Sequence, residues 1–411
     1  MPNSQKRPFT HQPSFTERTA KPLAMKPIQA DLFCRVIDNL GDIGVMWRLA
    51  RQLTQEKHWN IRLWVDDLSA LQRLVPTIDP KQASQQQAGI HVHDWSLPWS
   101  TSVEPRAVAI AGFSCDLPEP FLHKMAQQRR TTWLQLDYLS AESWVSDFHG
   151  RHSPRADGLT PIFFFPGFEP STGGLLREAG LITERQQWQQ DKRQAREWLQ
   201  SLGVTGLEGR EAQEGRPKLV SLFCYPEAPL DALQEGLQRV ASLAAGPWRA
   251  PVKVLVPAGV DLPSWVIESC GGRVSWYRIP FLSPADYDKL LWSMDLNFVR
   301  GEDSFVRAIW AGRPLVWQPY AQPEQAHLNK LNAWLARTEL PPEAQDSMSC
   351  WADRNRNDSF TSPMARALSP DAWRAWEAAS EAHSHRLARQ TDLASQIDHL
   401  CRGRPVSDHD G

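Results

Sequence analysis

Short apolar runs alternate with amphipathic helical periods along most of this chain, and the alternation comes in two successive series. In the first series, DLFCRVI (31–37) has the composition of a buried strand, and VMWRLARQLTQ (45–55) places its apolar residues on one helical face. Further strand candidates follow at 61–67, 107–113, 131–139 and 161–168. Strands that are apolar throughout are typical of a parallel sheet covered on both faces. The first series therefore predicts an α/β domain over residues 28–176.

The second series follows a stretch rich in Gln, Glu and Arg, which we interpret as a linker region over residues 177–217. Its strand candidates are 218–225, 252–258, 273–279, 295–300 and 314–320, and its helical stretches are 230–244, 284–294, 325–337 and 370–400. They predict a second Rossmann-like domain over 218–385, with a C-terminal helix and tail at 386–411. Two doubly wound α/β domains facing a central cleft are expected, because ligands bind at the carboxyl ends of parallel strands.

Composition excludes several other classes of protein. The 411 residues suffice for two domains, and a formal net charge of -2 argues against wrapping nucleic acid by bulk electrostatics. No apolar run reaches about 18 residues, so we expect no transmembrane helix. Residues 1–27 are polar and lack the apolar centre of a signal peptide. We interpret them as a disordered extension, with Met25 as an alternative start.

Cysteine and histidine spacing predicts neither a disulfide framework nor a metal site. The six cysteines are far apart and form no CxxC pair, which is typical of buried free thiols in a reducing cytoplasm. The histidine pairs have no acidic or cysteine residues at ligand spacing. No GxGxxG motif occurs in the chain, which disfavours a dinucleotide-dependent dehydrogenase.

Two carboxylates occupy the turn VIDNLGDIG (36–44), between the first strand and the first helix. Asp42 has a structural interpretation as a helix N-cap that accepts backbone N–H bonds. Asp38 is harder to explain in this way, because a cap needs one carboxylate and two on one turn repel each other. The pair therefore favours a site that handles a cation or a proton.

A second charged turn, VRGEDSFVR (299–307), follows a strand and opens a helix. Ser304 is expected to be the helix N-cap, and the helix start offers free N–H groups to a diphosphate. Arg300 can neutralise phosphate charge, whereas Glu302 is better suited to the hydroxyls of a sugar diol. The turn favours a nucleotide diphosphate; the alternative is a surface network of charged side chains around a capped helix.

Aromatic residues lie at corresponding places in the second series. Phe223 and Tyr225 end its first strand, and Phe281 and Tyr287 precede the strand that leads to the second charged turn. A nucleotide base can stack on such rings, which contributes roughly 1–3 kcal/mol per base. Packing in the core is the alternative for each ring.

These residues lie in stretches that resemble a known family, the EarP family of protein-arginine rhamnosyltransferases that modify translation elongation factor P. The resemblance spans about 31 to 400, and its motifs are long and specific. The matching stretches are CRVIDNLGDIGVMWRLARQL (34–53), LDYLSAESWV (136–145), FFFPGFEPSTGGLLRE (163–178), SLFCYPE (221–227), VRGEDSFVRAIWAGRPLVWQPY (299–320) and QAHLNKL (325–331).

The resemblance implies a GT-B fold with two Rossmann-like domains, and an inverting transfer of rhamnose from dTDP-β-L-rhamnose without a metal or other cofactor. The implied acceptor is one arginine of elongation factor P, whose modification rescues ribosomes stalled at consecutive prolines. Neither nucleic acid nor a membrane is an implied partner.

The resemblance also implies roles for individual residues. Asp42 matches the general base, Asp38 its acidic companion, and Glu302 is a further catalytic candidate. The implied nucleotide-sugar pocket consists of Asn39, Gly41, Phe223, Tyr225, Phe281, Tyr287, Arg300, Glu302, Asp303 and Ser304. Leu40 and the stretch QPY (318–320) depart from the family pattern, so the local shape of the pocket is expected to differ.

This interpretation gives the two charged turns opposite tasks. The guanidinium of an arginine has a pKa above about 12, so carboxylates of the first turn would hold a cation and accept its proton as the new bond forms. The second turn would stabilise the departing diphosphate. Two alternatives are a GT-B enzyme with another donor or acceptor, and a protein that binds elongation factor P without modifying it.

Overall fold

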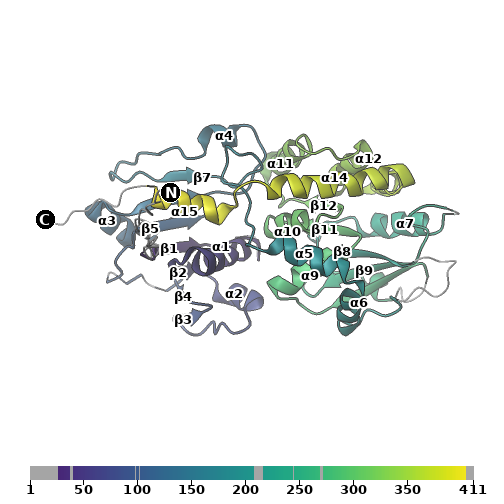
Figure 1. Cartoon of the computed structure of the whole chain (residues 1–411), viewed down its shortest axis with the longest axis horizontal. Helices are drawn as coiled ribbons and strands as arrows, with labels where there is room; N and C mark the ends of the chain where they lie inside the picture. Colours follow the sequence, from purple (N-terminus) through teal and green to yellow (C-terminus); the bar gives the residue numbers. More distant parts are fainter. Residues whose placement is uncertain are drawn as a thin grey trace, which may run out of the picture.

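The chain folds into two lobes that lie side by side along the long axis of the molecule (Figure 1). The computed structural model describes residues 26–37, 40–97, 99–100, 102–207, 216–243, 245–268 and 272–403, without the side chains of 357 and 358. Each lobe is built on its own sheet, and the N-terminal lobe contains the first charged turn while the C-terminal lobe contains the second. Within these ranges no helix has the length and apolar character needed to cross a membrane.

The N-terminal lobe has a seven-stranded sheet in the order β3-β4-β2-β1-β5-β6-β7. All neighbouring strands are parallel except β3, which pairs antiparallel with β4 at the edge. Its strands are β1 (Gln29–Cys34), β2 (Asn60–Val65), β3 (Ser84–Gln87), β4 (Ile90–Asp94), β5 (Val108–Gly112), β6 (Thr132–Leu136) and β7 (Ile162–Phe164). The predicted parallel α/β domain is confirmed here, and the β3–β4 hairpin is an addition that the sequence analysis missed.

The helices of this lobe are α1 (Gly41–Lys57), α2 (Leu68–Leu74), α3 (Glu119–Gln128) and α4 (Trp144–Phe148). Gly112 of β5 lets α1 approach the sheet, because a side-chain carbon at Gly112 would lie 2.7 Å from Met46 Sδ and 3.0 Å from the carbonyl oxygen of Phe33. This close packing fixes the N-terminal end of α1 at the carboxyl end of β1.

The C-terminal lobe has a five-stranded sheet in the order β10-β9-β8-β11-β12, and all its strands are parallel. The strands are β8 (Lys218–Leu222), β9 (Val252–Pro257), β10 (Val274–Ile279), β11 (Leu296–Arg300) and β12 (Leu315–Gln318). Its helices are α5 (Leu181–Gln190), α6 (Lys192–Ser201), α7 (Leu230–Ala241), α8 (Ser264–Glu268), α9 (Pro284–Ser293), α10 (Asp303–Ala311), α11 (Ala326–Leu335), α12 (Pro342–Ala352), α13 (Thr361–Ala367) and α14 (Pro370–Ala388), with 3-10 turns η1 (Pro323–Gln325) and η2 (Arg354–Ser359).

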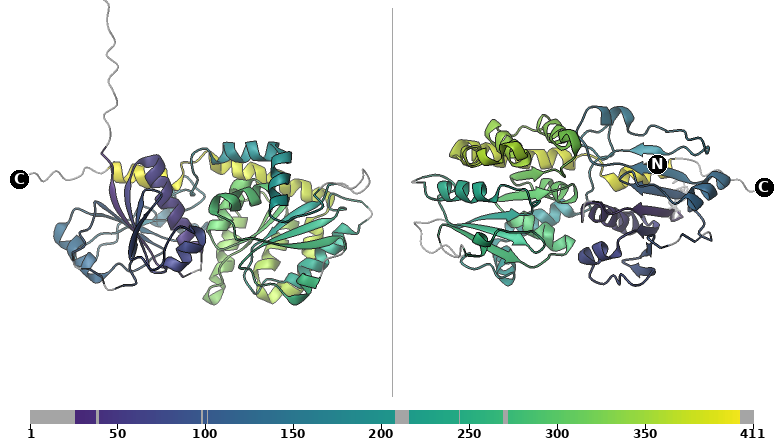
Figure 2. Two further views of the ribbon diagram at one scale, coloured as in Figure 1. Left: turned by 90° about the horizontal axis from the view of Figure 1, so that it is seen from below. Right: turned by 180° about the vertical axis from the view of Figure 1, so that it is seen from behind.

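The parts of the chain near the two connections between the lobes differ from the sequence-based prediction. Helices α5 and α6 lie in the stretch that we interpreted as a linker. Helix α5 nevertheless packs on the C-terminal lobe, where Trp188 Nε1 donates to Ser293 Oγ at 2.9 Å. At the other end of the chain, α15 (Leu393–Arg402) returns to the N-terminal lobe and buries Leu393 and Ile397 against its core (Figure 2). The helical stretch predicted at 370–400 is therefore two helices, one on each lobe, and α15 lies within the C-terminal helix and tail predicted at 386–411.

Candidate active site

The two charged turns meet between the lobes, where α1 and α10 lie next to each other (Figure 1). Two cavities adjoin this meeting point. We call one the aromatic cavity, a space of about 750 Å³ that includes open solvent and is lined by residues that include Phe223, Phe281 and Arg300. We call the other the acidic cavity, a space of about 870 Å³ that includes open solvent and is lined by residues that include Asp42 and Glu302.

Gly41 and Gly301 line both cavities and form the partition between them. Gly301 has a φ of 61°, in the left-handed region that favours glycine, and it directly follows β11. Since neither residue has a side chain, groups bound in the two cavities can come close to each other at this point.

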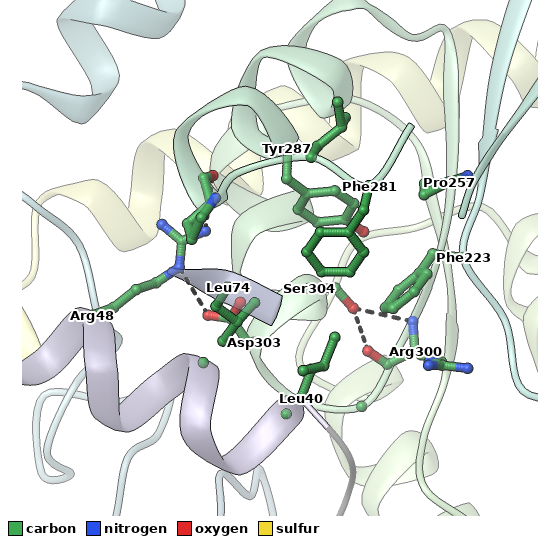
Figure 3. A pocket seen from close by; sticks show the side chains of 15 residues that line it. Leu40, Arg48, Leu74, Phe223, Pro257, Phe281, Tyr287, Arg300, Asp303 and Ser304 are labelled. Carbon is green, nitrogen blue, oxygen red and sulfur yellow. Dashed lines mark hydrogen bonds and ion pairs between the residues drawn. The ribbon is translucent and has the colours of Figure 1, made fainter. Parts of the chain in front are cut away.

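The aromatic cavity draws its walls from both lobes. The rings of Phe223, Phe281 and Tyr287 point into one space, and Leu40 and Leu74 approach it from the N-terminal lobe (Figure 3). Leu40, one of the departures from the family pattern, thus takes part in the wall of this cavity.

A fixed positive charge lies in the same wall. The guanidinium carbon of Arg300 is 4.2 Å from the ring centre of Phe223 and 4.8 Å from that of Tyr225. One of its nitrogens donates to the carbonyl oxygen of Cys224 at 2.8 Å. Tyr225 does not line either cavity; it supports Arg300 and pairs edge-on with the ring of Tyr320 at 5.7 Å.

The expectation that Ser304 caps α10 is wrong. Helix α10 begins at Asp303, its N-cap is Glu302, and no side chain makes a cap hydrogen bond. The hydroxyl of Ser304 bonds back to the peptide groups of Arg300 instead, accepting from its N–H at 3.2 Å and donating to its carbonyl oxygen. Ser304 therefore closes the turn after β11, and it still lines the aromatic cavity.

In the acidic cavity, Asp42 is almost fully buried, with 3% of its surface exposed. It lies in the first turn of α1 but is not its N-cap, which is Leu40. Its carboxylate accepts the backbone N–H of Ile37 at 2.8 Å, which ties the start of the helix to the segment that follows β1. Asp38 and Asn39 lie outside the described residues, so their assigned roles stay predictions.

Glu302 enters the acidic cavity from the C-terminal lobe. Its Oε2 accepts the backbone N–H of Leu139 at 2.9 Å, and its Oε1 lies 3.5 Å from Lys330 Nζ. Burial raises the pKa of Glu302 to about 7; the charge of Asp42 acts in the same direction, and Lys330 opposes it. Two carboxylates from different lobes thus share one cavity, which is suited to binding a cation.

Glu302 and Asp303, adjacent in sequence and grouped together in the sequence analysis, face different cavities. Successive residues at the start of a helix point roughly 100° apart. Glu302 lines the acidic cavity, whereas Asp303 lines the aromatic cavity. The structure therefore places Glu302 beside Asp42 and apart from the aromatic residues with which it was predicted to bind the donor.

Asp303 belongs to a buried ionic cluster that joins the lobes. Its Oδ1 lies 3.1 Å from Arg48 Nε of α1, and Arg48 also reaches Asp288 Oδ2 of α9 at 3.3 Å. Arg307 bonds both oxygens of Asp288 at 2.8 and 2.7 Å and Glu178 at 2.6 Å. Burial raises the pKa of Asp303, and the two arginines act against this. For Glu178, burial opposes ionisation, but Arg307 and Arg48 hold its pKa at about 2.

Several lining residues were not predicted from the sequence. Gly44 and Arg48 are four residues apart on one face of α1, and a side-chain carbon at Gly44 would lie 3.3 Å from Asp303 Oδ2. Because residues four apart lie on the same face of a helix, this spacing could have predicted that Gly44 and Arg48 face the same cavity. Lys330 and Tyr138 had no signal beyond their place in matching stretches, because only the tertiary fold brings them to the cavity.

A family model described as "Elongation-Factor P (EF-P) rhamnosyltransferase EarP" matches residues 30–402. The chain belongs to the EarP family. A protein-arginine rhamnosyltransferase of Pseudomonas putida is 40% identical over 387 residues, which cover 90% of this chain and 98% of that relative. One of Pseudomonas aeruginosa is 44% identical over 317 residues, covering 74% of this chain and 80% of the relative.

A solved structure described as "Structural basis for EarP-mediated arginine glycosylation of translation elongation factor EF-P" is 29% identical to this chain. It matches with a TM-score of 0.57 over 92% of this chain and 99% of its own length. This EarP protein is accordingly a glycosyltransferase with the GT-B fold, as predicted. The roles proposed below for the individual site residues rest on the geometry of the two cavities.

Proposed function

We propose that the chain transfers L-rhamnose from dTDP-β-L-rhamnose to an arginine side chain of translation elongation factor P, with inversion at the anomeric carbon. The observation that carries this proposal is the pair of cavities that meet at Gly41 and Gly301. The acidic cavity holds the carboxylates of Asp42 and Glu302 with one lysine among aromatic side chains, and the aromatic cavity holds three rings, Arg300 and the Arg48–Asp303 ion pair. A cationic acceptor and an anionic leaving group each find complementary charge on their own side.

In the proposed reaction the acceptor arginine enters the acidic cavity as a cation. Asp42 and Glu302 orient one guanidinium nitrogen towards the anomeric carbon at the partition. As the N–C bond forms and the bond from carbon to the diphosphate oxygen breaks, Asp42 accepts the proton that the nitrogen loses. Attack from the acidic cavity on a sugar whose leaving group points into the aromatic cavity is an in-line displacement, which inverts the configuration.

The leaving dTDP would remain in the aromatic cavity. Its base would stack on Phe223 or Phe281, and its diphosphate would meet Arg300 and the free N–H groups at the start of α10. These groups offset the charge that develops on the diphosphate, so we propose no metal ion for this step. Tyr287 completes the apolar wall of this cavity. Asp303 is paired with Arg48, and its negative charge would bind the hydroxyls of the sugar or hold the cavity wall together; it would not bind the diphosphate.

The acceptor and its setting follow from relatives. The family description and the related solved structure both name elongation factor P, and we extend that acceptor to this chain. The modification would activate the factor for rescue of ribosomes stalled at consecutive prolines. We place the reaction in the cytoplasm, since Cys34, Cys115, Cys224 and Cys350 are free thiols.

Intact-mass spectrometry of elongation factor P, incubated with the purified chain and dTDP-β-L-rhamnose, tests the proposal. We expect one added deoxyhexosyl group, located on an arginine by peptide mapping, and no addition when that arginine is replaced by lysine. Tight binding without an adduct would favour a non-catalytic binding protein. Faster transfer from UDP-glucose would refute the donor, and an adduct on another protein alone would refute the acceptor.

A further inference from the structure

A lysine lies in the acidic cavity, where a cationic substrate is proposed to bind. Lys330 of α11 has a largely buried side chain, with 17% exposed, and its Nζ lies 3.5 Å from Glu302 Oε1. The same nitrogen lies 5.2 Å from the ring centre of Tyr138, on the N-terminal lobe. The ammonium group of Lys330 would repel the guanidinium of the acceptor. Its presence in this cavity therefore calls for a role that offsets this repulsion.

The charges around Glu302 indicate that task. Asp42 faces it from α1, Lys330 faces it from α11, and the N–H of Leu139 donates to it from the segment after β6. Burial and Asp42 both favour the protonated form of Glu302, whereas Lys330 favours the carboxylate. With all three side chains charged, the group carries two negative charges and one positive charge, which leaves one net negative charge for one guanidinium.

We propose that Lys330 is a positioning residue that favours the ionised form of Glu302 and holds it against Leu139, so that the acidic cavity binds a single monocation. This inference rests on the proposed function, because it assigns Lys330 a part in accepting arginine. Lys330 acts through Glu302 and does not contact the reacting atoms. Its contact with Tyr138 also joins the lobes, so the test must separate charge from packing.

Three variants make this separation. Lys330→Met keeps an apolar stem against Tyr138 and removes the charge, Lys330→Arg keeps the charge, and Glu302→Gln removes the titrating group. Lys289→Met is a matched control, because Lys289 also pairs with a carboxylate, Asp286 at 2.9 Å, and lies over a tryptophan ring at 5.6 Å, away from both cavities.

The first readout is stability against pH and needs no enzymatic activity. The unfolded chain releases the Glu302 proton near 4.5 and the folded chain near 7, so stability falls as pH rises between these values and then levels off. In Lys330→Met the fall should continue above pH 7, and in Glu302→Gln it should disappear. The double variant with both Lys330→Met and Glu302→Gln should likewise show no fall in stability in this pH range. Lys289→Met should leave this window unchanged, since Asp286 has a lowered pKa.

The second readout is the pH profile of kcat/KM for transfer to elongation factor P. In Lys330→Met its acid limb should move up by about 1–3 pH units, the usual effect of one close charge, and Lys330→Arg should restore it. The proposal would be overturned if the acid limb of the kcat/KM profile stays in place in Lys330→Met, or if Lys330→Arg shifts it as far as Lys330→Met does. If Lys330→Met does not fold, Lys330→Gln replaces it in both readouts. A wild-type chain that transfers no sugar would refute the proposed function, while the stability readout would still decide whether Lys330 controls Glu302.

Discussion

Replacing Asp42 by Asn tests the assignment of the catalytic base at small structural cost. The Asp42 carboxylate accepts the N–H of Ile37 at 2.8 Å, and the carbonyl oxygen of an asparagine can accept the same bond. A hydrogen bond of this kind contributes about 0.5–1.5 kcal/mol, so weakening it in Asp42→Asn should lower the free energy of unfolding by about that amount.

The expected loss of rate is much larger. Without a group to accept the guanidinium proton, transfer should slow by about 10²–10⁴-fold, the usual contribution of a general base. This corresponds to about 2.7–5.4 kcal/mol of activation free energy. Removing the Asp42 charge also removes one of the influences that raise the pKa of Glu302, so that pKa should fall. Binding of dTDP, in the other cavity, should stay close to wild type.

Asp66→Asn is a matched control. Asp66 accepts the backbone N–H of Val36 at 2.9 Å, next to the peptide that Asp42 holds, but it does not line the acidic cavity. Single-turnover transfer followed by intact mass, with dTDP binding by calorimetry, separates the two variants. Equal losses of transfer rate in both variants would show that Asp42 holds the loop and is not the base. A loss of transfer rate in Asp42→Asn that only follows the unfolded fraction of the protein would show the same.

Three further substitutions test the donor site, the lobe contact and the fold. Phe281→Ala should weaken dTDP binding by roughly 1–3 kcal/mol in calorimetry if its ring stacks on the base, and unchanged affinity would remove Phe281 from the donor site. Arg48→Met should lower the free energy of unfolding by about 3–5 kcal/mol, because it leaves Asp303 buried without its partner; a loss under about 1 kcal/mol in denaturant titration would contradict the cluster. Gly112→Ala should destabilise the chain by about 1–3 kcal/mol through contact with Met46, and an unchanged melting temperature would argue against the close packing of α1.

Much of the fold could be predicted because parallel strands covered on both faces are continuous apolar runs. Strands such as β1 and β9 and the helix α1 were found in this way. The edge strand β3, with the sequence SQQQ, has no apolar residue and gave no such signal. Helix α15 was predicted as a helix, but periodicity carries no information on which lobe it packs against.

The charged turns could be recognised from sequence, and the division of their residues between two cavities could not. Glu302 and Asp303 are neighbours, and only the direction in which each leaves the start of α10 separates the acidic from the aromatic cavity. Ser304 has the composition of a cap, yet its hydroxyl bonds to Arg300 because the turn after β11 is tight. Lys330 reaches Glu302 from another helix, so its part depends on tertiary packing alone.

A crystal structure of the chain with dTDP and guanidinium ion bound together tests the central claim most directly. We expect the diphosphate beside Arg300 and Ser304 in the aromatic cavity, and the guanidinium between Asp42 and Glu302 in the acidic cavity. The two ligands should approach each other only at Gly41 and Gly301. A guanidinium bound outside the acidic cavity, or a diphosphate bound within it, would contradict the account.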